Sequence, residues 1–273
     1  MIAVVNTFEE SWKDFREHLS QWIKVAFVPF VLWLIGLVFM EMGSYLFGEF
    51  KFTITPESVL QNEAEGSLVL DLYTVIHYVL ETLAGLVLNI NGYRYAALGE
   101  GGDKWWTFPL NKRLLKIFLY YLFIFVLYIV CAVIATGITA GSYVLVENIF
   151  LTVLLAILLA VGLVGLMTRL SLTLLYVAVD QKEPLRTSWH LMKGNVLKLF
   201  KLFFLISFVV LGIAILGSAI IGGVGWILSL VNEKLGSIIF FLFVPFGFFI
   251  WFVSEVLMMK AIALVNKQLM ENK

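Results

Sequence analysis

The sequence predicts an all-α integral membrane protein with six transmembrane helices, and three observations lead to that fold class. Hydrophobic residues make up 61% of the 273 residues and charged residues only 14%, a balance typical of membrane proteins rather than soluble domains. Several apolar runs are longer than the roughly 18 residues that a helix needs to cross the hydrocarbon layer. No segment alternates polar and apolar residues over roughly ten positions, as the strands of a membrane barrel do.

Six apolar segments follow one another along the chain, and we expect each to form one transmembrane helix within a single polytopic domain, residues 1–273. The fourth segment is longer than the bilayer is thick. We therefore expect it to tilt, to bend near Gly162 and Gly165, or to extend into water. The predicted spans are 22–47, 68–98, 114–138, 146–179, 199–221 and 237–265.

The distribution of basic residues predicts the orientation of these spans. Of the 19 Lys and Arg residues, all but Lys51 and Lys234 lie near the N-terminus, the second and fourth connections or the C-terminus. Basic residues in short loops stay on the cytoplasmic side, so both termini are expected to be cytoplasmic. The formal net charge is zero, so we expect no nucleic-acid partner.

A short motif, Trp-x-x-apolar-x-x-polar, stands before each odd-numbered span. We interpret it as the sign of three repeats, 8–98, 103–179 and 185–265, each an interfacial amphipathic helix followed by a helical hairpin. A simpler alternative is that these residues only flank the spans as anchors. The three copies are Trp12, Phe15 and His18, then Trp105, Phe108 and Asn111, then Trp189, Met192 and Asn195.

The segments that carry the motif have the composition of helices that lie in the membrane interface. In the first, the apolar residues Phe8, Trp12 and Phe15 recur at steps of four and three, which places them on one helix face. Trp prefers the interface because its ring is apolar and its N–H is polar. We therefore predict Trp12, Trp105, Trp189 and Asn195 as interfacial anchors, with a bend into the membrane at Gly194-Asn195.

The second span carries the largest group of polar residues within the membrane. His77 and Glu81 are four residues apart and share a helix face, and Asn89 follows two turns later. Ionisable residues in a span are costly and are functional candidates, here for a proton relay or a polar-headgroup site. The alternative is a polar contact that holds the helices together. Gly85 and Gly92 on this span, and Gly137 and Gly141 on the third, are expected to mark close helix contacts.

Three further ionisable residues, Arg94, Arg169 and Glu255, lie within the even-numbered spans at a similar distance from their cytoplasmic ends. Similar depth permits a cluster of Arg and carboxylate side chains. An Arg at this depth also suits a lipid phosphate, because its guanidinium makes paired hydrogen bonds to phosphate oxygens. These three residues are therefore candidates for binding a lipid headgroup or another polar ligand. The simpler alternative is that the Arg side chains extend along their helices so that the charged ends reach the membrane interface.

Two segments resemble a known family. They are RLSLTLLYVAVDQKEPLRTSWHLMKGNVLKLFKLFFL, from Arg169, and GYRYAALGEGGDKWWTF, from Gly92. They are similar to the membrane domain of glycerophosphoryl diester phosphodiesterases and to stand-alone, YciC-like bacterial inner-membrane proteins. That family has an Arg-rich start to a span, a short acidic turn, and Ser-Arg/Trp-x-Leu-x-x-Gly-Asn before the next span. The matching residues are Ser188, Trp189, Leu191, Gly194 and Asn195, whereas Leu174-Leu175 stand where the family has a proline.

The resemblance implies a six-span fold in the bacterial inner membrane, linked with envelope lipids. It implies no catalytic residues, because the sequence has no segment corresponding to the phosphodiesterase barrel. The sequence also shows no His-Glu-x-x-His, Gly-x-Ser-x-Gly, phosphate-loop or Cys-x-x-Cys motif, and its three histidines are scattered. We expect neither an enzyme nor a metal or cofactor site.

The function predicted first is therefore a non-enzymatic protein that binds, transports or helps to organise envelope phospholipids. A second hypothesis is a proton-coupled transporter or channel that uses the polar residues of the second span. A third is a structural or assembly partner of another membrane protein. The most informative observation is whether a cavity reaches both Glu81 and the level of Arg94 and Arg169. Tight packing of the polar spans without a cavity favours the third hypothesis.

Overall fold

The computed structural model describes residues 2–47, 64–109, 111–146, 148–232, 239 and 242–271, and in these ranges the chain is helical with turns and no strand. Six helical segments are long and apolar enough to cross a membrane, in agreement with the predicted all-helical, multi-pass protein. The long helices are α2 (Leu19–Phe47), α3 (Ala64–Leu98), α4 (Lys112–Val146), α5 (Ile149–Leu170), α8 (Val196–Val231) and α10 (Phe243–Glu271). The shorter helices are α1 (Val4–Glu17), α6 (Thr173–Ala178) and α7 (Pro184–Leu191).

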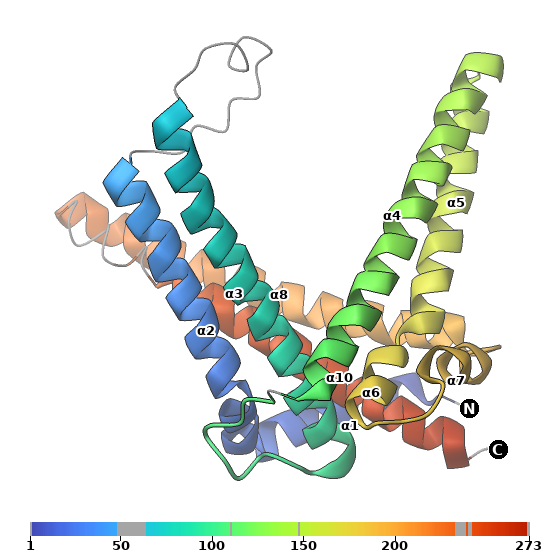
Figure 1. Cartoon of the computed structure of the whole chain (residues 1–273), viewed down its shortest axis with the longest axis horizontal. Coiled ribbons are helices and arrows are strands. Elements are labelled where there is room, and N and C mark those ends of the chain that lie inside the picture. The colour runs from blue at the N-terminus through green and yellow to red at the C-terminus, as the bar shows by residue number, and fades with distance from the viewer. Residues whose placement is uncertain are drawn as a thin grey trace.

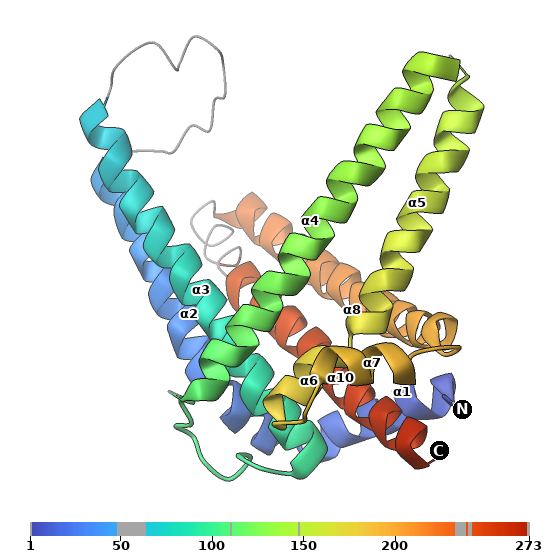
Figure 2. The same cartoon turned by 45° about the vertical axis from the view of Figure 1, so that its right-hand side comes forward.

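The long helices form two hairpins that diverge and a third pair behind them. Helices α2 and α3 make one hairpin, α4 and α5 make the other, and α8 and α10 cross behind both (Figures 1 and 2). The two ends of the chain meet, because the backbone N–H of Ala3 donates to Oε1 of Gln268 at 3.2 Å.

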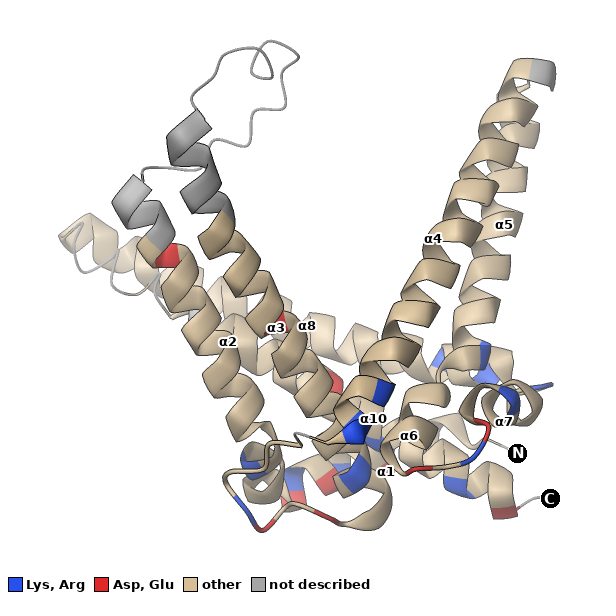
Figure 3. Cartoon of the chain, in the orientation of Figure 1, with Lys and Arg blue, Asp and Glu red and all other residues tan. Residues whose placement is uncertain are grey.

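The Lys and Arg residues of the described ranges gather at the end of the molecule that holds α1, α6, α7 and the termini (Figure 3). The sequence places nearly all Lys and Arg residues on one side of the spans, and this is the corresponding end of the molecule. The two exceptions, Lys51 and Lys234, lie outside the described residues, as does the predicted start of the sixth span at 237.

The main apolar core lies at this same end of the molecule. It joins side chains of α1, α2, α3, α6, α7, α8 and α10, whereas the large side chains along α4 and α5 are mostly exposed on the chain by itself. In a bilayer, lipid tails would cover that exposed apolar surface. Members of the core with no exposed surface include Trp22, Leu172, Leu175, Met192, Leu199, Val256 and Leu257.

Glycine sets the close approach of helices in the packed part of the molecule. A Cβ at Gly92 would overlap the sulfur of Met259, so the predicted contact role of Gly92 is confirmed between α3 and α10. A Cβ at Gly85, Gly137 or Gly141 would meet no atom of the described residues within 4 Å, so the structure shows no close helix contact at these three glycines. Spacing alone does not show which face of a helix has a neighbour.

The fourth span breaks, but at a different place from the predicted bend. Helix α5 runs without interruption through Gly162 and Gly165 and ends at Leu170, and α6 starts at Thr173. At the break, the hydroxyl of Ser171 donates to the carbonyl of Thr168 at 2.8 Å. A Ser side chain thus hydrogen-bonds a backbone group at the point where the helix ends.

A helix is present at two of the three places where an interfacial helix is predicted. Helices α1 and α7 carry Trp12 and Trp189, but residues 99–109 around Trp105 are turns and coil, so the prediction of a helix there is wrong. Gly99 and Gly101 adopt left-handed φ values of 72° and 93°, which L side chains rarely adopt and which end the helical path. The bend predicted before α8 is confirmed, because Gly194 has φ 81° and Asn195 is the N-terminal cap position of α8.

Candidate ligand-binding cavity between the hairpins

The polar residues on one face of α3 lie in two different environments, a contact with α2 and a cavity. His77 Nε2 lies 3.8 Å from Glu81 Oε2, as expected for residues one helical turn apart. The imidazole is buried against α2, where a Cβ on Gly36 would come within 3.2 Å of its Nδ1. The side chain of Glu81 is about half exposed and faces a cavity.

This cavity has a volume of about 510 Å³ and is formed by α2, α3, α4 and α10. Four polar side chains line it, Glu81, Thr82 and Asn89 from α3 and Glu255 from α10. Leu86 and Leu88 also line it, together with four aromatic side chains. The aromatic side chains are Trp33, Tyr121, Phe248 and Trp251.

A second, almost wholly apolar groove adjoins the cavity along α3 and α4. It has a volume of about 860 Å³ and shares Thr82 and Leu86 with the cavity. Its remaining lining consists of Val75, Tyr78, Val79, Leu83, Asn111, Leu114, Leu115 and Phe118. A polar pocket and an apolar groove therefore meet across two residues of α3.

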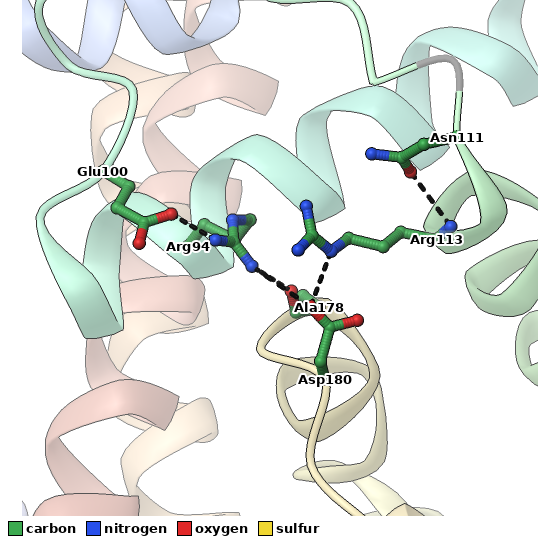
Figure 4. Close-up of polar contacts among 6 residues, drawn as sticks. All are labelled: Arg94, Glu100, Asn111, Arg113, Ala178 and Asp180. Carbon is green, nitrogen blue, oxygen red and sulfur yellow. Dashed lines mark hydrogen bonds and ion pairs between the residues drawn. The ribbon is translucent and has the colours of Figure 1, made fainter.

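Arg94 does not line this cavity. It is bound by residues that lie at the same end of the molecule as Arg94 itself. It pairs with Glu100, donates to the carbonyl of Ala178 at 3.0 Å, and lies 3.7 Å from Asp180 (Figure 4). Nε of Arg113 donates to the same Asp180 carboxylate at 2.6 Å. One carboxylate thus connects α3, the start of α4 and the turn before α7.

Arg169 has different surroundings again. Its guanidinium lies 4.6 Å from the centre of the Trp189 ring, a cation–π arrangement that joins the end of α5 to α7. Its backbone carbonyl accepts from the buried hydroxyl of Ser188 at 2.6 Å. The cluster that similar depth permitted for Arg94, Arg169 and Glu255 is therefore not formed, because each lies against a different set of residues.

The other predicted anchors contact protein as well as facing outward. Trp12 packs against the core from α1, and Trp105 lies in its loop against Phe27 of α2, with ring centres 5.5 Å apart. The side-chain N–H of Asn195 reaches the carbonyl of Leu191 at a long 3.5 Å.

Sequence reasoning missed one polar group, centred on Asp14 of α1. Its carboxylate lies 2.8 Å from Nζ of Lys260 and accepts from the indole N–H of Trp22 at 3.1 Å. Lys260 therefore makes an ion pair inside the protein instead of reaching for the membrane surface. The spacing of Asp14 on an amphipathic helix indicates only a polar face, and its partner on α10 is distant in sequence.

The chemistry available in the cavity is that of its polar lining residues. Within the described ranges, His, Cys, Asp and Glu form no group of three that would suit a metal ion. The polar groups in the cavity are two carboxylates, one amide and the hydroxyls of Thr82 and Tyr121, among aromatic rings. Such groups hold a proton, a cation or a polar headgroup.

No protein-family model, curated protein or solved structure matches this chain. The resemblance to the phosphodiesterase membrane domain therefore stays a prediction.

Proposed function

We propose that the chain is a non-enzymatic membrane protein that binds membrane lipid in the space between its two hairpins. The observation that carries this proposal is the polar cavity of Glu81, Asn89 and Glu255 directly beside an apolar groove. A pocket with a few polar groups next to a long apolar surface fits a molecule with a headgroup and a hydrocarbon tail.

The setting of the protein belongs to the same proposal. The gathered Lys and Arg residues support an orientation with both termini in the cytoplasm. The family resemblance supports a bacterial inner membrane and a role with envelope lipids. Transport of the bound lipid, or its organisation together with another membrane protein, would both start from this binding step.

The test is lipid retention by the purified protein. We expect phospholipid to co-purify, and Val79→Trp, which fills the apolar groove, to reduce the retained amount several-fold. Leu154→Trp is the matched control, because Leu154 is an exposed apolar residue of α5 outside the groove. Equal lipid retention by both variants, measured by mass spectrometry, would argue against this site.

A second candidate function is proton-coupled transport, and the same cavity supports it. Glu81 faces the cavity and lies within 3.8 Å of His77, so a proton can be shared between a cavity-facing and a buried group. In liposomes with an imposed pH gradient, we expect proton flux that Glu81→Gln abolishes and Glu41→Gln preserves. Flux that is unchanged by Glu81→Gln would exclude this function.

A further inference from the structure

We propose that the cavity selects a ligand whose polar end carries an ammonium nitrogen, and disfavours a purely anionic headgroup. This inference rests on the proposed function and deepens it by naming the class of headgroup. It is argued from the charge, the hydrogen-bonding groups and the aromatic walls of the cavity.

The charge of the lining is of one sign. Glu81 and Glu255 line the cavity, and no Lys or Arg does. Within the part of the chain that the structure describes, the side-chain carboxyl group of Glu255 makes no hydrogen bond or ion pair. A carboxylate inside a membrane protein is costly without a counter-charge, and a cationic ligand would supply one.

The third polar group also presents an acceptor. The side-chain N–H of Asn89 donates to the carbonyl of Gly85 in the same helix at 2.8 Å. This hydrogen bond uses one of the two N–H groups of the amide and leaves its Oδ1 for a ligand. The cavity therefore offers acceptors from Glu81, Asn89 and Glu255, which match the N–H donors of an ammonium group.

The aromatic residues form a continuous wall beside these acceptors. The ring of Phe248 lies 4.9 Å from that of Trp33 and 5.3 Å from that of Trp251, measured between centroids. Faces of Trp and other aromatic rings attract cations, and aromatic walls of this kind recognise ammonium ligands. The same electron-rich faces repel an anion.

Two basic residues that the sequence offers as headgroup candidates are engaged elsewhere and do not line the cavity. Arg94 is held by Glu100, Ala178 and Asp180, and Arg169 lies on the ring of Trp189. A phosphate without an ammonium group would thus find no cationic partner at the polar end of the site. The apolar groove that begins at Thr82 and Leu86 would take the hydrocarbon chain of an amphiphile.

The test compares two lipids that differ in headgroup alone. The full chain in nanodiscs is titrated with a dioleoyl lipid that has an ethanolamine headgroup or one that has a glycerol headgroup, and binding is followed by native mass spectrometry. We expect about tenfold tighter binding of the ethanolamine lipid. Glu255→Gln and Glu81→Gln should each remove most of this preference. Glu41→Gln, an exposed carboxylate of α2 outside the cavity, should leave it unchanged.

Free methylammonium chloride, which keeps the N–H donors of an ammonium group, is the second arm, and its binding is followed by isothermal titration calorimetry. Saturable binding that Trp251→Phe weakens, and that Trp226→Phe on the exposed face of α8 leaves in place, supports the inference. Trp251→Phe preserves an aromatic ring, so an unchanged melting temperature separates a lost site from a misfolded protein.

The outcomes separate the two proposals. If both lipids bind saturably with equal affinity, the headgroup inference is overturned and lipid binding stands. If neither lipid binds, the proposed function fails. The ammonium arm then decides the inference, since binding of methylammonium keeps it for a free amine and no binding overturns it.

Discussion

The packed helices α3 and α10 differ sharply from the hairpin of α4 and α5. In the most apolar window of α10, 50% of the residues are buried inside the protein, whereas the corresponding window of the fourth span has none. Helices α3 and α10 carry His77, Glu81 and Glu255 in their middle parts. Residues 117–144 and 149–168, in α4 and α5, contain no Asp, Glu, Lys or Arg.

The difference shows how a membrane protein distributes its polar residues. A helix surrounded by lipid provides no polar partner for an ionisable side chain. Such a residue there would raise the free energy of membrane insertion by about 3 kcal/mol. A helix with protein neighbours can direct the same residue at a partner or into a cavity. Helix α4 therefore adds mostly apolar lining, and α3 and α10 carry the charged groups of the candidate site.

The largest expected loss of stability comes from a substitution at a close contact between two helices. Gly92→Leu should destabilise the protein by about 3 kcal/mol, because the new side chain must displace Met259 where α3 and α10 touch. Gly137→Leu on α4 is the control and should change stability little, since a Cβ there meets no atom. Thermal unfolding in detergent measures both, and equal shifts would show that the two regions do not differ in packing.

A smaller loss is expected from the partly buried ion pair of α1 and α10. Asp14→Asn should cost about 2 kcal/mol, because Lys260 stays largely covered with its counter-charge removed. The double variant Asp14→Asn/Lys260→Met should recover part of that loss, since no unpaired charge is left. Additive losses in the same unfolding measurement would show that the two residues do not interact.

The Asp180 carboxylate, which pairs with both Arg94 and Arg113, is more exposed. Asp180→Asn should cost about 1 kcal/mol at low salt and less at high salt, because these ion pairs are partly screened by water. Glu183→Gln breaks a single, more exposed pair with Arg186 and should have almost no effect. A loss that is independent of salt would contradict an electrostatic role.

The smallest loss of stability is expected at the contact between the hairpin of α4 and α5 and helix α7. Trp189→Leu removes the ring beneath Arg169 and should cost about 0.5–1 kcal/mol. Arg169→Lys should keep much of the interaction, because an ammonium group also attracts the ring. If both variants unfold at the wild-type temperature, this contact does not stabilise the attachment.

The sequence by itself determined the class and layout of the protein. Runs of apolar residues long enough to cross a bilayer led to six helices, since a backbone in lipid must satisfy its own hydrogen bonds. The Gly194-Asn195 bend was also predictable, because glycine readily adopts the left-handed backbone. His77, Glu81, Asn89 and Glu255 were candidates because ionisable or polar groups are rare at membrane depth.

Only the tertiary structure decided how these candidates combine. Glu255 joins Glu81 and Asn89 in one cavity, although its depth in the sequence placed it with Arg94 and Arg169. The aromatic wall could not be predicted either, because in the sequence Trp33 and Trp251 are indistinguishable from other apolar residues of a span. Periodicity tells which residues share a helix face, and the packing of distant helices then decides what that face meets.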